Sequence, residues 1–176
     1  DTTNNKVFIA YGKSFKLYGV VGTVSGTSIS FGTIIEITTP VSSVGKLALT
    51  FDSLNDKVII FYQDSGVTNC ELQAITISGT SFTFGAGTVV VAGGTNGSAL
   101  TFDPVNQKSI LVYETGNNVY YRVLTISGTT VVQSSAVAIE TSSDLARDLR
   151  LEYDTTSGKI MLLYHDTYAT DEIKSY

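Results

Sequence analysis

The sequence is poor in cysteine and in charge, and each shortage excludes a class of protein. The single cysteine, Cys70, rules out an intrachain disulfide. We expect Cys70 to be a half-buried strand residue, because its neighbours Asn69 and Glu71 supply no base that would make the thiol reactive. Only 15% of the residues are charged, so Thr, Ser, Asn and Gly must provide much of the polar surface. Such a surface is common in extracellular and virion-surface β proteins.

Basic clusters, long hydrophobic runs and helical periodicity are also missing. The 11 Lys and Arg residues are spread along a chain whose formal net charge is −5. We therefore expect neither a nucleic acid nor a membrane surface as partner. No apolar run reaches the roughly 18 residues of a spanning helix. Residues 142–150 are the one stretch that could form a turn of helix.

What the sequence does contain is an internal repeat. Three series of residues recur at a spacing of 51 positions, as from 52 to 103. They are Asp1, Asp52, Asp103 and Asp154, then Lys6, Lys57, Lys108 and Lys159, then Tyr11, Tyr62, Tyr113 and Tyr164. Three independent series with one period indicate tandem structural units.

Each unit predicts four short strands, A to D. Strand A (46–52, 98–103, 149–154) alternates apolar and polar residues, whereas strand B (57–62, 108–113) is a continuous apolar run typical of a strand buried on both faces. Strand C (71–77, 119–126) and strand D (28–37, 81–91, 130–139) flank a Ser-Gly-Thr hairpin. Its glycines, Gly26, Gly79 and Gly128, supply the positive φ of a tight turn. Gly32 and Gly85 predict a bulge inside strand D.

Four antiparallel strands in each repeat predict an all-β fold, a β-propeller-type array of four-stranded antiparallel blades. We expect one β-repeat domain over residues 1–176, with units 1–45, 46–97, 98–148 and a partial 149–176, about three and a half 51-residue repeats. Closed propellers usually have about four to eight blades. We therefore expect the sequence to belong to a longer chain, or to be completed by another copy in a closed ring or an open assembly.

The hairpin region 22–33 (GTVSGTSISFGT), with Phe51-Asp52 and the run 57–62 (KVIIFY), resembles the tandem repeats of virion structural and tail-fibre-like proteins of marine bacteriophages. The resemblance implies a virion-surface or extracellular location and a structural and binding role. It carries no catalytic motif, and we expect no catalytic residue, no cofactor and no metal site.

The repeated residues have a structural and a functional interpretation. The Asp series could form a ring of metal-binding carboxylates, but its presence in every unit favours turns in which each carboxylate accepts backbone N–H groups. We expect the Lys series to cover these turns or to pair with the aspartates. The Tyr series could stack on sugars, although packing between blades is the commoner use of such rings.

The loops between strands B and C vary most and are where we expect recognition. His165 stands there at the repeat position that Gln63 and Glu114 occupy in other units. Arg122, Arg147 and Arg150 lie at unequal repeat positions, which does not favour a sialidase-like clamp. The candidate binding residues of these loops are Asp64, Asn69, Glu114, Asn117, His165, Asp166 and Tyr168.

Taken together, these features favour a non-enzymatic structural or binding module of an extracellular or virion-surface assembly. Its expected partners are other copies of itself or adjoining repeats, with a cell-surface glycan as candidate ligand. One alternative is a carbohydrate-active propeller enzyme, which would need two carboxylates at a set separation, such as Glu114 and Asp166. Another is a subunit of an extracellular filament.

Overall fold

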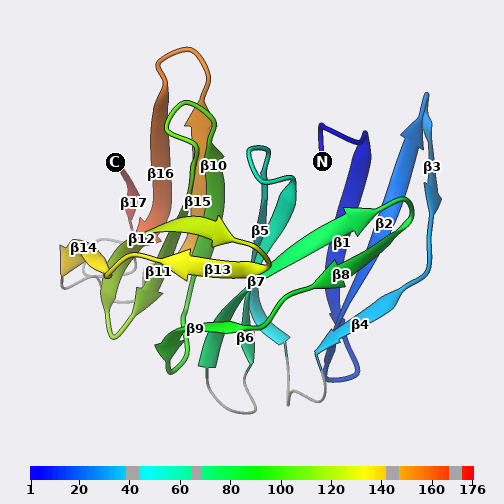
Figure 1. Ribbon diagram of the computed structural model, residues 1–176. Helices are drawn as coiled ribbons and strands as arrows, with labels where there is room; N and C mark the ends of the chain where they lie inside the picture. The colour runs from blue at the N-terminus through cyan, green and yellow to red at the C-terminus, as the bar shows by residue number, and fades with distance from the viewer. Residues whose placement is uncertain (39–43, 65–68, 142–146, 167–171) are drawn as a thin grey trace.

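The computed structural model describes residues 1–38, 44–64, 69–141, 147–166 and 172–176, and its regular elements are all β-strands (Figure 1). None of these described residues forms a helix long and apolar enough to cross a membrane. The expected helical turn at 142–150 falls partly outside the described residues, and the remainder, from Arg147, belongs to a strand.

The strands form four antiparallel sheets, numbered here 1 to 4 along the chain. Sheet 1 contains β1 (Lys6–Lys13), β2 (Lys16–Ser25), β3 (Ser28–Phe31) and β4 (Ile35–Thr38). Sheet 2 contains β5 (Val44–Asp52), β6 (Lys57–Asp64), β7 (Asn69–Ser78), β8 (Ser81–Phe84) and β9 (Thr88–Ala92). Sheet 3 contains β10 (Ser98–Asp103), β11 (Lys108–Thr115), β12 (Asn118–Ser127), β13 (Thr130–Gln133) and β14 (Val137–Thr141). Sheet 4 contains β15 (Arg147–Asp154), β16 (Lys159–Asp166) and β17 (Glu172–Ser175).

Consecutive strands pair within each sheet, in the order β5-β6-β7-β8 for sheet 2. This arrangement confirms the expected all-β array of antiparallel blades, with one correction to the fourth strand. Strand D is two strands, since β8 and β9 both pair with β7. Gly85 lies in the break between them, and the bulge comes later, where the pairing with β9 shifts between Cys70 and Glu71.

Glycine is required at these breaks because the next sheet packs closely over them. A Cβ on Gly32 would overlap the carbonyl oxygen of Thr80, in the C–D hairpin of sheet 2. A Cβ on Gly85 would likewise overlap the carbonyl oxygen of Thr129, in the hairpin of sheet 3. Each hairpin therefore rests on the broken outer strand of the sheet before it, which joins successive repeats.

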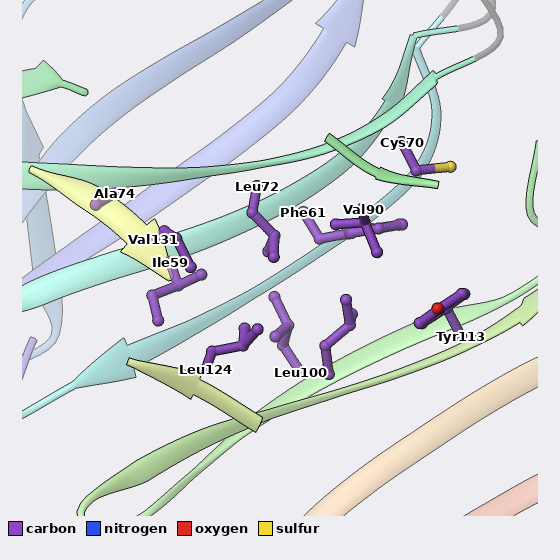
Figure 2. Close-up of a cluster of buried hydrophobic side chains, with 11 residues drawn as sticks. Ile59, Phe61, Cys70, Leu72, Ala74, Val90, Leu100, Tyr113, Leu124 and Val131 are labelled. Carbon is purple, nitrogen blue, oxygen red and sulfur yellow. The ribbon is translucent and has the colours of Figure 1, made fainter. Parts of the chain in front are cut away.

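Apolar clusters fill the space between successive sheets. Figure 2 shows the cluster between sheets 2 and 3, where Phe61 and Leu72 point toward Leu100 and Leu124. Sheets 2 and 3 each contribute to a cluster on both faces. Successive side chains of a strand point to opposite faces of the sheet. Burial of both faces therefore explains the continuous apolar run of strand B.

Cys70 belongs to the same cluster and is fully buried rather than half-buried as expected. Its Sγ lies 3.4 Å from the carbonyl oxygen of Gly93. Burial raises the pKa of the thiol to about 11, so the reactive thiolate is scarce at neutral pH.

The innermost strands are β5, β10 and β15, the three strands A, with β10 lying beside both of the others. All three begin at one end of the molecule, where residues at their starts line a common cavity. The turns between strands A and B lie at the opposite ends of these strands.

Candidate functional site

The repeated aspartates are engaged in the A–B turns. The Asp52 carboxylate accepts hydrogen bonds from the backbone N–H groups of Leu54 and Asn55, both at 3.0 Å. Asp103 and Asp154 form the same kind of turn. The Asp103 carboxylate accepts the N–H of Val105 at 2.9 Å, and the Asp154 carboxylate accepts the N–H of Thr156 at 2.8 Å. Burial alone would raise the pKa of Asp103, but hydrogen bonds from Asn106 and Val105 hold it below its usual value. The repeated aspartates therefore hold the A–B turns by accepting their backbone N–H groups.

The repeated lysines do not pair with these aspartates. Lys6 Nζ donates to Thr23 Oγ1 at 2.7 Å, and Lys57 Nζ lies 3.5 Å from the carbonyl oxygen of Asp56. Among the residues that the structure describes, no ion pair joins the two series. The repeated glycines Gly26, Gly79 and Gly128 have φ of +58°, +61° and +62° in the C–D turns.

The repeated tyrosines pack between sheets and use their hydroxyls there. Tyr62, Tyr113 and Tyr164 are all buried within the three clusters. Tyr62 donates to Glu71 Oε2 at 2.8 Å, and the Tyr113 hydroxyl accepts from Arg122 Nε at 3.2 Å. Their rings are therefore inaccessible as platforms for sugars, and only Tyr11, on sheet 1, is partly exposed.

Glu114, a candidate loop residue, has a different environment from the one expected. Its side chain is fully buried, and its two carboxylate oxygens accept the backbone N–H groups of Asn96 at 3.1 Å and Asn117 at 3.0 Å. Glu114 thereby ties the β11–β12 turn to the connection that leads into β10. The carboxylate is therefore engaged in structural contacts, whereas its loop position predicts an exposed side chain.

Asp166 is also buried, within a polar network between sheets 3 and 4. Lys174 Nζ lies 2.7 Å from Asp166 Oδ2 and 2.8 Å from Glu140 Oε1. Glu140 also accepts a hydrogen bond from the hydroxyl of Tyr164. Lys174 and Tyr164 hold the pKa of Glu140 below its usual value. Glu114 and Asp166 are thus both occupied by structural contacts and do not form an exposed catalytic pair.

The other candidate loop residues are dispersed. Asn69 is half-buried at the start of β7, and Asn117 adopts φ of +62° in the β11–β12 turn. His165 lines an open hollow of about 510 Å³ on sheet 4, beside Leu163 and Ile173. The side chain of Asp64 and all of Tyr168 lie outside the described residues.

A polar cavity of about 120 Å³ lies where the innermost strands begin. Ser98 Oγ is buried without a hydrogen-bond partner, whereas Lys46, Asp148 and Arg150 are exposed. Arg150 Nη1 donates to the carbonyl oxygen of Leu149 at 2.9 Å, which leaves further N–H groups of the guanidinium for other acceptors. The cavity is lined by Lys46, Leu47, Asn96, Gly97, Ser98, Asp148, Leu149 and Arg150.

This cavity was not predicted from the sequence, although a signal was present in the repeat. Ala48 and Ala99 occupy the strand positions at which the fourth unit has Arg150. Gly97 likewise corresponds to Asp148, which adopts φ of +52°, a backbone conformation that few residues other than glycine accept. Departures from the repeat at the starts of strand A mark the cavity, whereas loop variability indicates the B–C loops.

Among the described residues, no group of three His, Cys, Asp or Glu side chains is placed to hold a metal ion. Asp148 is the only carboxylate among the described residues that line the polar cavity. The exposed side chains there can donate hydrogen bonds from two cations and accept them at one carboxylate.

Comparisons with known proteins bear on the fold. No protein-family model matches the chain, and none of the curated proteins matches it. The chain is similar to the crystal structure of an exo-beta-1,3-galactanase from Phanerochaete chrysosporium with beta-1,3-galactotriose, with a TM-score of 0.58 and 11% sequence identity. The similarity covers 92% of this chain and 44% of that protein, so the chain spans less than half the length of the galactanase. At this identity the likeness concerns the fold, and the chain is an all-β protein of propeller-like architecture.

Proposed function

We propose that the chain is a non-enzymatic binding module of an extracellular or virion-surface assembly, which recognises a glycan at the end where β5, β10 and β15 begin. One observation carries this proposal: the two ends of the innermost strands differ. The A–B turns repeat the same aspartate contacts from unit to unit. The opposite end breaks the repeat with Lys46, Asp148 and Arg150 around a polar cavity. Structural contacts follow the repeat, whereas a site for one ligand departs from it.

A glycan suits the chemistry of this end. Sugars present many hydroxyl groups, which donors and acceptors placed in a cavity can bind and orient. The cavity offers both kinds, with the two cations as donors and Asp148 as an acceptor. The galactanase that shares the fold was crystallised with a galactotriose, which supports a carbohydrate as the first ligand class to test.

A carbohydrate-active enzyme is the second candidate function, and the likeness to the galactanase is the observation in its favour. Glycosidases use two carboxylates flanking the bond that is cleaved. Glu114 and Asp166 are buried in structural contacts, and Asp148 has no carboxylate neighbour among the described residues lining the cavity. We therefore favour binding, and release of reducing sugar from galacto-oligosaccharides would decide for the enzyme.

We propose further that the chain associates with additional blades, which come from other copies or from adjoining repeats. Met161, Leu163 and Ile173 lie on sheet 4 with exposed fractions of 48%, 37% and 78%. The residues 51 and 102 positions before Leu163, Val112 and Phe61, are buried against the next sheet. The outward face of sheet 4 therefore has the positions with which inner blades contact their neighbours.

The binding proposal is tested by screening the labelled 176-residue chain on a glycan array and on host-type cell surfaces. We expect binding to a restricted class of glycans, and the variant Arg150→Gln should lose it. The control Lys159→Gln, at the start of β16 and paired with the last residue of β15, should retain it. Electron microscopy of the same sample would show rings, filaments or particles if the blades associate. No glycan binding together with no assembly would reject the proposal.

A further inference from the structure

We propose that the polar cavity at the starts of β5, β10 and β15 holds the carboxylate of an acidic sugar, a uronic acid residue of the bound glycan. This inference rests on the proposed function and names the ligand class of the same site. The cavity joins three successive blades, since Lys46, Ser98 and Arg150 come from β5, β10 and β15. A group bound there would contact three units at once.

The charges at the cavity favour one anionic group. Two cations, Lys46 and Arg150, line it together with one carboxylate, that of Asp148. The remaining N–H groups of a guanidinium form a planar fork that matches the two oxygens of a carboxylate, and an ammonium group adds a point charge. Within the described residues, no ion pair between Asp148 and either cation neutralises the site.

The buried hydroxyl of Ser98 is the second observation. Ser98 Oγ has no hydrogen-bond partner although the atom is withdrawn from the protein surface, which is rare for a polar atom of a folded protein. The oxygen itself is covered in the unliganded chain, and we infer that rotation about the Ser98 Cα–Cβ bond turns the hydroxyl toward an acceptor bound in the cavity. An oxygen of a bound carboxylate supplies that acceptor, and the wall that holds Ser98 lies between the strands that carry the two cations.

Asp148 distinguishes an acidic sugar from a simple inorganic anion. Its exposed carboxylate would repel the second negative charge of a sulfate or phosphate, but it accepts a hydrogen bond from a sugar hydroxyl. We place only the carboxylate group inside the cavity of about 120 Å³. The ring then lies at the open mouth, where Asp148 is exposed.

Calorimetric titration of the full chain with trigalacturonic acid and with neutral galactotriose tests the inference. We expect the acid to bind at least about tenfold more tightly, a difference of roughly 1.4 kcal/mol. Lys46→Gln and Arg150→Gln should each weaken binding of the acid by about tenfold and binding of galactotriose by less, so that the preference for the acid shrinks. Lys159→Gln removes an equal charge at the start of β16, beside the last residue of β15, and is the matched control that should bind like wild type.

Ser98→Ala separates binding from folding. Removal of an unpartnered buried hydroxyl should not lower the urea midpoint of unfolding, whereas it should weaken binding of trigalacturonic acid. Equal affinity for the acid and galactotriose would overturn the inference while leaving glycan binding in place. An equal loss of affinity in the charge control Lys159→Gln, or full competition by sulfate, would also overturn it. Absence of binding to either sugar would instead count against the proposed function itself.

Discussion

At the scale of single residues, one side-chain type serves two purposes in this chain. Asp52 accepts two backbone N–H groups in a turn that recurs in later units, and the 51-residue spacing was sufficient to predict that turn. Asp148 stands where an earlier unit has Gly97 and lines the polar cavity. The repeat identifies what the units share. A departure such as Asp148 marks an unusual position, but the sequence does not show which residues surround it.

The burial of Glu114 and Asp166 illustrates the same limit. Both follow an apolar strand and were assigned to exposed loops, as acidic residues usually are. The sequence could not show that backbone N–H groups converge on Glu114, or that Lys174 lies beside Asp166. These contacts depend on how the loops and neighbouring strands fold around each carboxylate, which a periodic pattern does not show.

The glycine at the strand break offers a prediction at this scale. In Gly85→Ala the new Cβ would overlap the Thr129 carbonyl oxygen, and overpacking of this kind costs about 1–3 kcal/mol. We expect the free energy of unfolding, measured in urea, to fall by about 2 kcal/mol.

Ser134 is the matched control, because its N–H bonds to Val123 as that of Gly85 bonds to Ala74. Ser134 is exposed and already carries a Cβ, so Ser134→Ala should change stability by less than about 1 kcal/mol. Equal stabilities of the two variants would show that the hairpin does not rest on the break.

At the scale of strands and sheets, the sequence predicted strands A, B and C closely and strand D less well. Alternation and turn residues mark a strand locally, so β7 (Asn69–Ser78) extends the expected 71–77 by only a few residues. Strand D is broken because the hairpin of the next sheet occupies its middle, a tertiary contact. Gly85 predicts a bulge at its own position because glycine commonly marks one, whereas the register shifts nearer Val90.

The network around Glu140 connects sheets 3 and 4 and predicts a pH dependence. Glu140 has a lowered pKa in the folded chain, so its ionised form favours folding. This stabilisation is present at neutral pH and is lost as the pH falls through the usual glutamate range toward the folded pKa. Glu140→Gln should therefore be less stable than wild type at pH 7, by about 1 kcal/mol given the partial exposure of the pair.

Urea unfolding of both proteins at pH 7 and pH 3 measures this effect. The stabilities of wild type and Glu140→Gln should converge as the pH falls, because protonation removes the same charge from wild type. Glu152→Gln, which replaces an exposed carboxylate of β15, should match wild type at pH 7. A constant difference between wild type and Glu140→Gln at both pH values would contradict the role of the ionised carboxylate.

At the scale of the whole molecule, the architecture followed from the repeat. A four-stranded unit with apolar residues on both faces of strand B needs a neighbour on each side, and the clusters between sheets supply it. What the sequence could not locate was the cavity at the strand starts, because it depends on how three sheets meet. The number of blades in the complete assembly likewise lies beyond a periodic pattern.

The outward face of sheet 4 predicts self-association. Leu163 and Ile173 expose apolar surface at positions where inner blades contact a neighbour. We expect light scattering after size exclusion to give a mass above 18.8 kDa that rises with concentration. A value near twice that mass would favour a closed ring, and larger open-ended species would favour a filament.

The double variant Leu163→Lys and Ile173→Lys should return the chain to a monomer without loss of stability, because both side chains are exposed. Leu54→Lys, at an exposed position in an A–B turn, is the control and should associate like wild type. A wild-type chain of 18.8 kDa at every concentration would contradict association through this face.

The central claim is that recognition occurs where the repeat is broken, at the starts of the innermost strands. Amide chemical shifts of the isotope-labelled chain, followed during titration with trigalacturonic acid, test it most directly. The account predicts that the largest changes fall on Lys46, Gly97 and Asp148, which line the cavity. Largest changes in the A–B turns of Asp52 and Asp103, or changes scattered over the surface, would contradict it.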